Sequence, residues 1–289
     1  MGWFSLSIVA LVFFGIQKFL FKVVVEKGCS IMQTTAFFMG TVTLLAFSAF
    51  ALSGGALGDW RFVGKMALLN GTIFLIVTLL RMRSLRYIPS VIAYPIFQLS
   101  RILVVLFGLA YFQDSLNTIQ IGGIALGIAT TPFLSGDQHQ EPTRRRSVRI
   151  GLLLATGAVF GSAASEIIGK FTAISSSDLF VYIGISYAWN LLASGSYALV
   201  SHMRGKRSAQ WRTAAKYGIL IGVTNFIAFY AELSAFRTGP LSLVAVLSSF
   251  STLVAMGLAA WIYRERLDTK GKLGASLAIL SIILLGIRT

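Results

Sequence analysis

A face of polar residues crosses an otherwise apolar stretch between residues 84 and 127. Its members follow one another at steps of four, four and three residues, which places them on one side of a helix: Ser90, Tyr94, Gln98 and Arg101. A charge in the middle of a membrane span is costly, which predicts a cavity and a partner for Arg101. The guanidinium would either anchor a carboxylate or phosphate of a substrate or pair with a glutamate on a neighbouring helix.

Two carboxylates inside later apolar runs are the candidate partners of this arginine. Glu166 lies deep in its run, whereas Glu232 follows Asn225 by seven residues on the same face and lies near a predicted helix end. Each could pair with Arg101 or carry a proton, because carboxylates in a low-dielectric site load and release protons near neutral pH. For Glu232, an interfacial position remains an equal alternative.

Further polar side chains lie inside apolar runs. Lys18 could enter a cavity or extend its long side chain to the membrane surface. Tyr187 and Asn190 begin a polar stripe that either contacts substrate or forms hydrogen bonds between helices.

Enzyme signatures are missing from the sequence, which has no Gly-x-Ser-x-Gly elbow, no His-Glu-x-x-His pair and no P-loop. Cys29 is the one cysteine, so a metal site built on cysteine pairs is excluded. We therefore expect no catalytic residues, no cofactor, no metal and no direct use of ATP.

The elements that must position these side chains are membrane spans. Of the 289 residues, 56% are hydrophobic and 12% are charged, and a soluble domain carries about 25% charged residues. Apolar runs of roughly 20 residues, enough to cross a bilayer, recur along the chain. The net charge of +15 comes from Lys and Arg in short connections, as in membrane flanks, so we expect no nucleic-acid partner.

The apolar runs predict an all-α integral membrane protein, because they lack the alternation of barrel strands. Ten transmembrane helices are expected, at Gly2–Val25, Ile31–Leu52, Phe62–Leu80, Pro89–Tyr111, Asn117–Leu134, Ile150–Phe171, Asp178–Ser201, Ala214–Phe236, Pro240–Tyr263 and Thr269–Ile287.

A repeat organises these helices. Residues match at a shift of 151 without a gap: Arg86 with Arg237, Pro89 with Pro240, Ser100 with Ser251, Asp114 with Glu265, Leu116 with Leu267, Thr118 with Thr269 and Gly123 with Gly274. A hydrophilic linker, residues 135–149, separates a first five-helix repeat (1–134) from a second (150–289). Because each repeat has an odd number of spans, the second must be inverted in the membrane, as in many secondary transporters.

Most Lys and Arg residues flank the odd-numbered connections, and the positive-inside rule then places both termini outside. Arg86 and Arg237 are repeat mates that would face opposite sides. We therefore expect at least one of them to have a positional role rather than a topological one.

Each repeat ends with a proline-started helix, an acidic turn and a glycine-bearing helix, the turns being Gln113-Asp114-Ser115-Leu116 and Arg264-Glu265-Arg266-Leu267. This arrangement resembles the drug/metabolite transporter superfamily, of the ten-helix EamA-like type, over nearly the whole chain. The first turn departs from the family in having Asp114 where the usual acid is Glu. Relatives also keep both termini in the cytoplasm, against the charge count.

The resemblance implies a permease or exporter that works by alternating access through a central cavity. Transfer by position puts seven residues near that cavity: Tyr94, Gln98, Arg101, Glu166, Asn225, Glu232 and Ser248. We expect a small polar metabolite as substrate, such as an amino acid or organic anion, with proton coupling by Glu166 or Glu232 left open. The expected location is the lipid bilayer of a bacterial inner membrane. Two alternatives are a lipid-carrier flippase of the same fold and a membrane-embedded lipid-modifying enzyme.

Overall fold

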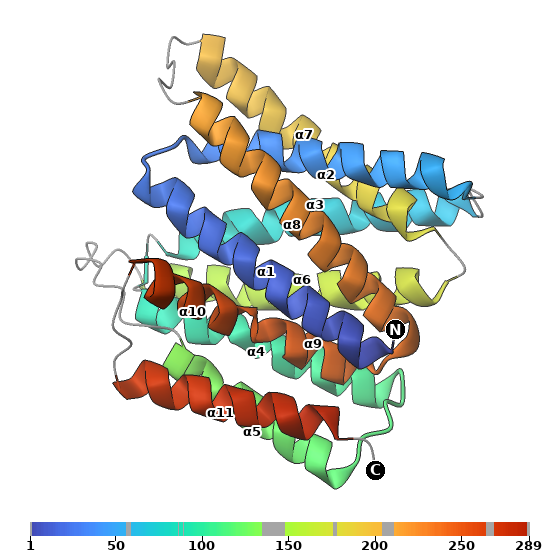
Figure 1. The fold of residues 1–289 in the computed structure, drawn as a ribbon, viewed down its shortest axis with the longest axis vertical. Coiled ribbons are helices and arrows are strands. Elements are labelled where there is room, and N and C mark those ends of the chain that lie inside the picture. Colours follow the sequence, from blue (N-terminus) through green and yellow to red (C-terminus); the bar gives the residue numbers. More distant parts are fainter. Residues whose placement is uncertain are drawn as a thin grey trace.

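A computed structural model describes residues 2–55, 59–85, 87–88, 90–134, 148–175, 178–203, 211–263 and 269–287. Helices are the only regular elements in these ranges, so the prediction of an all-helical chain is confirmed there (Figure 1). They are α1 (Trp3–Glu26), α2 (Ile31–Ser53), α3 (Trp60–Ser84), α4 (Ser90–Ala110), α5 (Thr118–Leu134), α6 (Val148–Ile174), α7 (Leu179–Met203), α8 (Trp211–Thr238), α9 (Leu241–Ser249), α10 (Ser251–Tyr263) and α11 (Thr269–Gly286).

Six segments of the described chain are long and apolar enough to cross a membrane: α1, α2, α3, α6, α8 and the combined Leu241–Tyr263. The chain is therefore a multi-pass membrane protein. Large apolar side chains such as Leu44, Leu153 and Trp261 are exposed on its outer surface, as expected where lipid replaces water. Arg86, Pro89 and the turn 264–267 lie outside the described residues.

The predicted span Pro240–Tyr263 is found as the apolar segment Leu241–Tyr263, but its helix is interrupted at Phe250, where α9 ends and α10 begins. The Phe250 N–H bonds to the Leu247 carbonyl, and the Leu253 N–H bonds to the Phe250 carbonyl, both with the shorter three-residue spacing. The hydroxyls of Ser249 and Ser251 also donate to backbone carbonyls three residues earlier. Serines on both sides of Phe250 thus offer the backbone an alternative to regular helix bonds.

The helices pack in pairs that join the two halves of the chain. The principal pairs are α1 with α8, α3 with α6, α2 with α7 and with α8, and α5 with α11. Figure 1 shows α5 and α11 side by side at one edge, with α2 and α7 toward the opposite edge. A buried core that includes Tyr182, Ile221 and Phe236 lies between these pairs.

A glycine allows α1 to approach α10 closely at the helix break. A Cβ added to Gly15 would lie 2.6 Å from the Ser251 carbonyl oxygen and would overlap the side chain of Val254. Small residues at such crossings let backbones meet in lipid, where contact area drives association. This contact places α1 beside the broken span.

The acidic turn after α4 caps a helix of the other half. Asp114 Oδ2 accepts hydrogen bonds from the backbone N–H of Ser242, at 2.8 Å, and from its hydroxyl, at 2.7 Å. Pro240, the residue at the N-cap of α9, makes no side-chain cap of its own. Asp114 therefore supplies the cap from across the structure, where a carboxylate also suits the positive end of the helix dipole.

Candidate functional site

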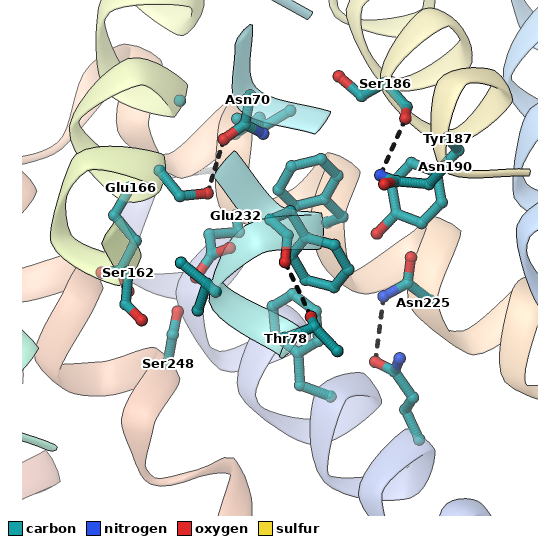
Figure 2. Close-up of a pocket in the computed structure, with 18 of the residues that line it drawn as sticks. Asn70, Thr78, Ser162, Glu166, Ser186, Tyr187, Asn190, Asn225, Glu232 and Ser248 are labelled. Atoms are coloured by element: carbon teal, nitrogen blue, oxygen red, sulfur yellow. Dashed lines mark hydrogen bonds between the residues drawn. The ribbon is translucent and has the colours of Figure 1, made fainter. Parts of the chain in front are cut away.

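A cavity of about 420 Å³ lies among the described helices α1, α2, α3, α4, α6, α7, α8, α9 and α10. Its size is within the range of small-molecule sites. Figure 2 shows Ser162 and Glu166 on one wall, facing Tyr187, Asn190 and Asn225 on another. The polar residues of its lining are Gln17, Lys18, Asn70, Thr78, Arg81, Arg101, Ser162, Ser165, Glu166, Ser186, Tyr187, Asn190, Asn225, Glu232, Ser248 and Ser251.

An ion pair joins α4 to α6 at the cavity wall. Arg101 Nη1 lies 2.5 Å from Glu166 Oε1, and the two side chains are 24% and 18% exposed. Arg101 Nε and Glu166 Oε2 are buried and have no hydrogen-bond partner in the described part of the chain. The two opposite charges therefore compensate each other, but the Arg101 Nε and Glu166 Oε2 atoms could still bind a water molecule or a ligand.

Two further cations reach the cavity without forming an ion pair within the described residues. Arg81, at the end of α3, donates from Nη2 to the hydroxyl of Ser162 on α6 at 2.7 Å. Its Nε is buried without a hydrogen-bond partner among the described residues. Lys18 Nζ donates to the hydroxyls of Ser251, at 2.8 Å, and Thr252, at 3.1 Å. Lys18 thus binds the first turn of α10, directly after the helix break.

Glu232 lies on the cavity wall, and its residue is only 8% exposed. Its side chain therefore lies inside the protein rather than on its outer surface, six residues before the end of α8 at Thr238. Asn225, two turns earlier on α8, donates from Nδ2 to Gln17 Oε1 at 3.1 Å. This bond holds the polar face of α8 against α1.

The polar side chains of α3 and α6 meet on another wall. Ser165 donates from its hydroxyl to Asn70 Oδ1 at 2.6 Å (Figure 2). On α7, Asn190 Nδ2 bonds to the Ser186 carbonyl at 3.0 Å, and both residues line the cavity with Tyr187. Tyr187 and Asn190 of the predicted polar stripe thus line the cavity, whereas the side chains of its other members, Ser194 and Tyr197, lie outside the described residues.

Six of the eight residues that the sequence singled out lie on the cavity: Lys18, Arg101, Glu166, Asn225, Glu232 and Ser248. Gln98 lies on α4 but is not among the described residues that line this cavity. Gln98 and Arg101 are three positions apart on α4, so their side chains point in directions about 60° apart around the helix axis. Of the two, Arg101 has the longer side chain, and it is the one that lines the cavity. The side chain of Tyr94 lies outside the described residues.

Sequence reasoning missed Arg81, Asn70, Gln17 and Ser165. Arg81 resembles a membrane flank in the sequence, because it lies near the end of an apolar run beside Arg83. A signal was present at helical spacing: Asn70, Phe74, Thr78 and Arg81 follow at steps of four, four and three, and all four line the cavity. The same steps had identified the face of Arg101.

The described lining carries three basic side chains, Lys18, Arg81 and Arg101, and two acidic ones, Glu166 and Glu232, a balance of +1. Because Arg101 is paired with Glu166, the cations that remain for an anionic group are Lys18 and Arg81. The lining also includes the rings of Phe14, Phe21, Phe38 and Phe229. The cavity therefore combines a cationic region with apolar walls.

The model of the EamA-like transporter family matches residues 149–287. Among solved structures, one described as "Crystal structure of protein" superposes with a TM-score of 0.76 at 16% sequence identity. The superposition covers 98% of this chain and 96% of that protein, so the two share a fold over their whole length. No match was found among curated protein sequences.

Proposed function

We propose that this chain is a secondary transporter of the drug/metabolite transporter superfamily, because the model of the EamA-like transporter family matches residues 149–287. Its substrate is a small polar metabolite with an anionic group, such as an amino acid or organic anion. The observation that carries this proposal is the set of buried polar atoms without hydrogen-bond partners at the cavity: Arg81 Nε, Arg101 Nε and Glu166 Oε2 in the described chain. A polar ligand would satisfy them.

The proposed architecture is two inverted five-helix units, residues 1–134 and 150–289, joined by the linker 135–149. The helix contacts support it. If α1 to α5 correspond to α6, α7, α8, α9–α10 and α11, the pair α1–α8 becomes α6–α3, and both pairs pack closely. Under the same correspondence, α2 and α7 exchange places, and so do α5 and α11. Each of these two packed pairs is therefore mapped onto itself, as expected for contacts that lie on a twofold axis. Transport then proceeds by alternating access around a cavity at the axis.

The proposed substrate contacts follow from charge. Lys18 and Arg81 bind the anionic group, because within the described residues both donate to hydroxyls, which they can exchange for a carboxylate or phosphate. Arg101 and Glu166 orient polar groups of the solute, with Asn225 and Ser248 on the facing walls. Glu166 and Glu232 are the candidate proton carriers. A soluble solute is favoured over a lipid carrier because charged and amide side chains cover several walls of the cavity.

The proposal is tested by transport in proteoliposomes. A thermal-shift screen of the purified protein against metabolites first selects a ligand, since ligands that bind only the folded state raise the melting temperature. Arg101→Ala is then expected to abolish uptake of that ligand while the protein still inserts in the membrane. Arg61→Ala is the control, because Arg61 is exposed at the start of α3 and does not line the cavity. Normal transport by Arg101→Ala would remove Arg101 from the site.

The setting proposed for this activity is a bacterial inner membrane, with proton coupling as one possible drive. Coupling is tested by comparing uptake with and without an imposed pH gradient. Uptake that follows the solute gradient alone would assign a facilitative mechanism to the same cavity.

A further inference from the structure

A buried lysine ties α6 to the end of α8. Lys170 Nζ donates to the carbonyl oxygens of Phe236, at 2.5 Å, and Gly239, at 2.8 Å. These are among the last carbonyls of α8 and its connection to α9, which have no partner within the helix. A cation there also suits the negative end of the helix dipole. Lys170 is 7% exposed and lies 5.6 Å from the ring of Phe112.

A second bond runs in the opposite direction between the same helix ends. Arg237, in the last turn of α8, donates from Nε to the Ala173 carbonyl at 2.9 Å, beside the end of α6. This contact is what a positional role for Arg237 would require. Each helix thus supplies a cation to the final carbonyls of the other.

This double tie lies at the end of the molecule where both chain termini are found, which we call the terminus end. Gly239 is in close approach to Trp3, the first residue of α1. Figure 1 shows the two termini on this same side. Phe107, Tyr111, Phe112 and Phe171 form a ring cluster next to the tie. At the terminus end, α6 and α8 are therefore in direct contact.

The repeat supplies a counterpart for each part of the tie. Lys18-Phe19 in α1 corresponds to Lys170-Phe171 in α6 at a shift of 152, one more than in the later helices. Phe236 and Gly239 correspond to Leu85 and Ile88 after α3, at the shift of 151. The backbone hydrogen bonds correspond as well. The Gly239 N–H donates to the Ala235 carbonyl, and the Ile88 N–H donates to the carbonyl of Ser84, which corresponds to Ala235 at the shift of 151.

The counterpart tie is not made in this structure. Within the described chain α6 packs against α8, whereas α1 has hardly any contact with α3, so the equivalent helix ends stand apart. Lys18 Nζ binds the hydroxyls of Ser251 and Thr252 instead of α3. We call the end near residues 27–30 and 85–88 the opposite end. The residues that correspond to the tie are present there, but Lys18 donates to hydroxyls of α10 rather than to the carbonyls of Leu85 and Ile88.

We propose that Lys170 and Lys18 are alternating locks of the two ends of the cavity. Lys170 on the carbonyls of Phe236 and Gly239 holds the terminus end closed. In the other state Lys170 leaves them, and Lys18 moves from Ser251 and Thr252 to the carbonyls of Leu85 and Ile88, closing the opposite end. This inference rests on the proposed transport function and assigns its gating to two named side chains.

The test measures which side of the membrane reaches the cavity. Cys29, which is buried, is replaced by alanine, and Ser165→Cys provides a reporter on the cavity wall. A charged, membrane-impermeant thiol reagent is applied to intact cells and to inverted vesicles. Lys170→Met is expected to increase the labelling rate from the terminus end about tenfold, the factor that one charge-assisted hydrogen bond is worth.

Lys18→Met must act in the opposite direction. Without Lys18 the opposite end cannot lock, so labelling from that side stays the same or rises and labelling from the terminus end falls. Lys22→Met is the matched control on α1, because Lys22 lies 3.9 Å from Glu26 and does not line the cavity. It should change neither rate.

Unchanged sidedness in Lys170→Met, or a shift in the same direction in both lysine variants, overturns the proposal. If Lys170→Met does not give a monodisperse protein, Lys170→Gln is measured, which retains a donor for one carbonyl and should give a smaller shift of the same sign. Unchanged sidedness in Lys170→Gln overturns the proposal equally. The labelling does not depend on any solute, so an intact chain that transports nothing would refute the proposed function separately.

Discussion

Arg101 on α4 and Glu166 on α6 form an ion pair of 2.5 Å at the wall of the cavity. Their helices come from different halves of the chain, so the pair connects the two proposed repeats at the place where solute would bind. The residue that corresponds to Arg101 at the shift of 151 is Thr252, so the second repeat has no equivalent ion pair. The two proposed repeats therefore differ in this charged feature.

Removing one partner of this pair should cost more stability than removing both. Arg101→Gln or Glu166→Gln leaves a partly buried charge without its partner, which typically costs about 3 kcal/mol in the free energy of unfolding. The double variant removes both charges and should recover part of that loss. Thermal melting of the four proteins in detergent measures the coupling, and strictly additive losses would mean that the two side chains are energetically independent.

The cap that Asp114 provides for α9 should be visible as stability. Asp114→Ala removes the acceptor for the Ser242 N–H and hydroxyl, and loss of a cap typically costs about 1 kcal/mol. Asp114→Asn keeps an acceptor oxygen and should retain more of the stability. The comparison is Asp59→Ala, which removes the local cap of α3 at the Phe62 N–H. Equal melting temperatures for Asp114→Ala and the unsubstituted protein would contradict the assignment.

Close approach at Gly15 should make even one methyl group unfavourable. A Cβ there would meet Val254 and the Ser251 carbonyl, and such overpacking costs about 1–3 kcal/mol. Gly64→Ala in α3 is the matched control, because nothing lies within 4 Å of a Cβ at that position. It should be neutral or stabilising by up to about 1 kcal/mol through helix propensity. Melting temperatures of the two variants should therefore shift in different directions, and a tolerated Gly15→Ala would place α1 farther from α10.

The orientation in the membrane can be decided with single cysteines in the Cys29→Ala background. The charge count predicts that Lys27, between α1 and α2, is cytoplasmic and that Ser115, between α4 and α5, is outside. Ser115→Cys should then react with an impermeant thiol reagent on intact cells, and Lys27→Cys only in inverted vesicles. The reverse result would place both termini in the cytoplasm, as in the family that the sequence resembles.

Several features were predictable because they depend on local pattern or on repetition. The apolar runs gave the helices within a few residues, since each span must satisfy its own backbone in lipid. Burial of Arg101, Glu166 and Asn225 at a cavity followed from the cost of placing polar groups against lipid. The break at Phe250 was missed, because serines in a membrane helix usually bond backward without interrupting it.

What the sequence by itself determined is the class of the protein and the polar residues that must avoid lipid, because hydropathy and the cost of buried charge act on each segment separately. Tertiary structure decided the partners. That Arg101 meets Glu166, that Arg81 enters the cavity and that Gln98 does not line it depend on how helices distant in sequence rotate and pack. The structure also decided the partners of Lys18 and Lys170, which recur in the sequence at a shift of 152: Lys18 donates to hydroxyls at the start of α10, and Lys170 donates to carbonyls at the end of α8.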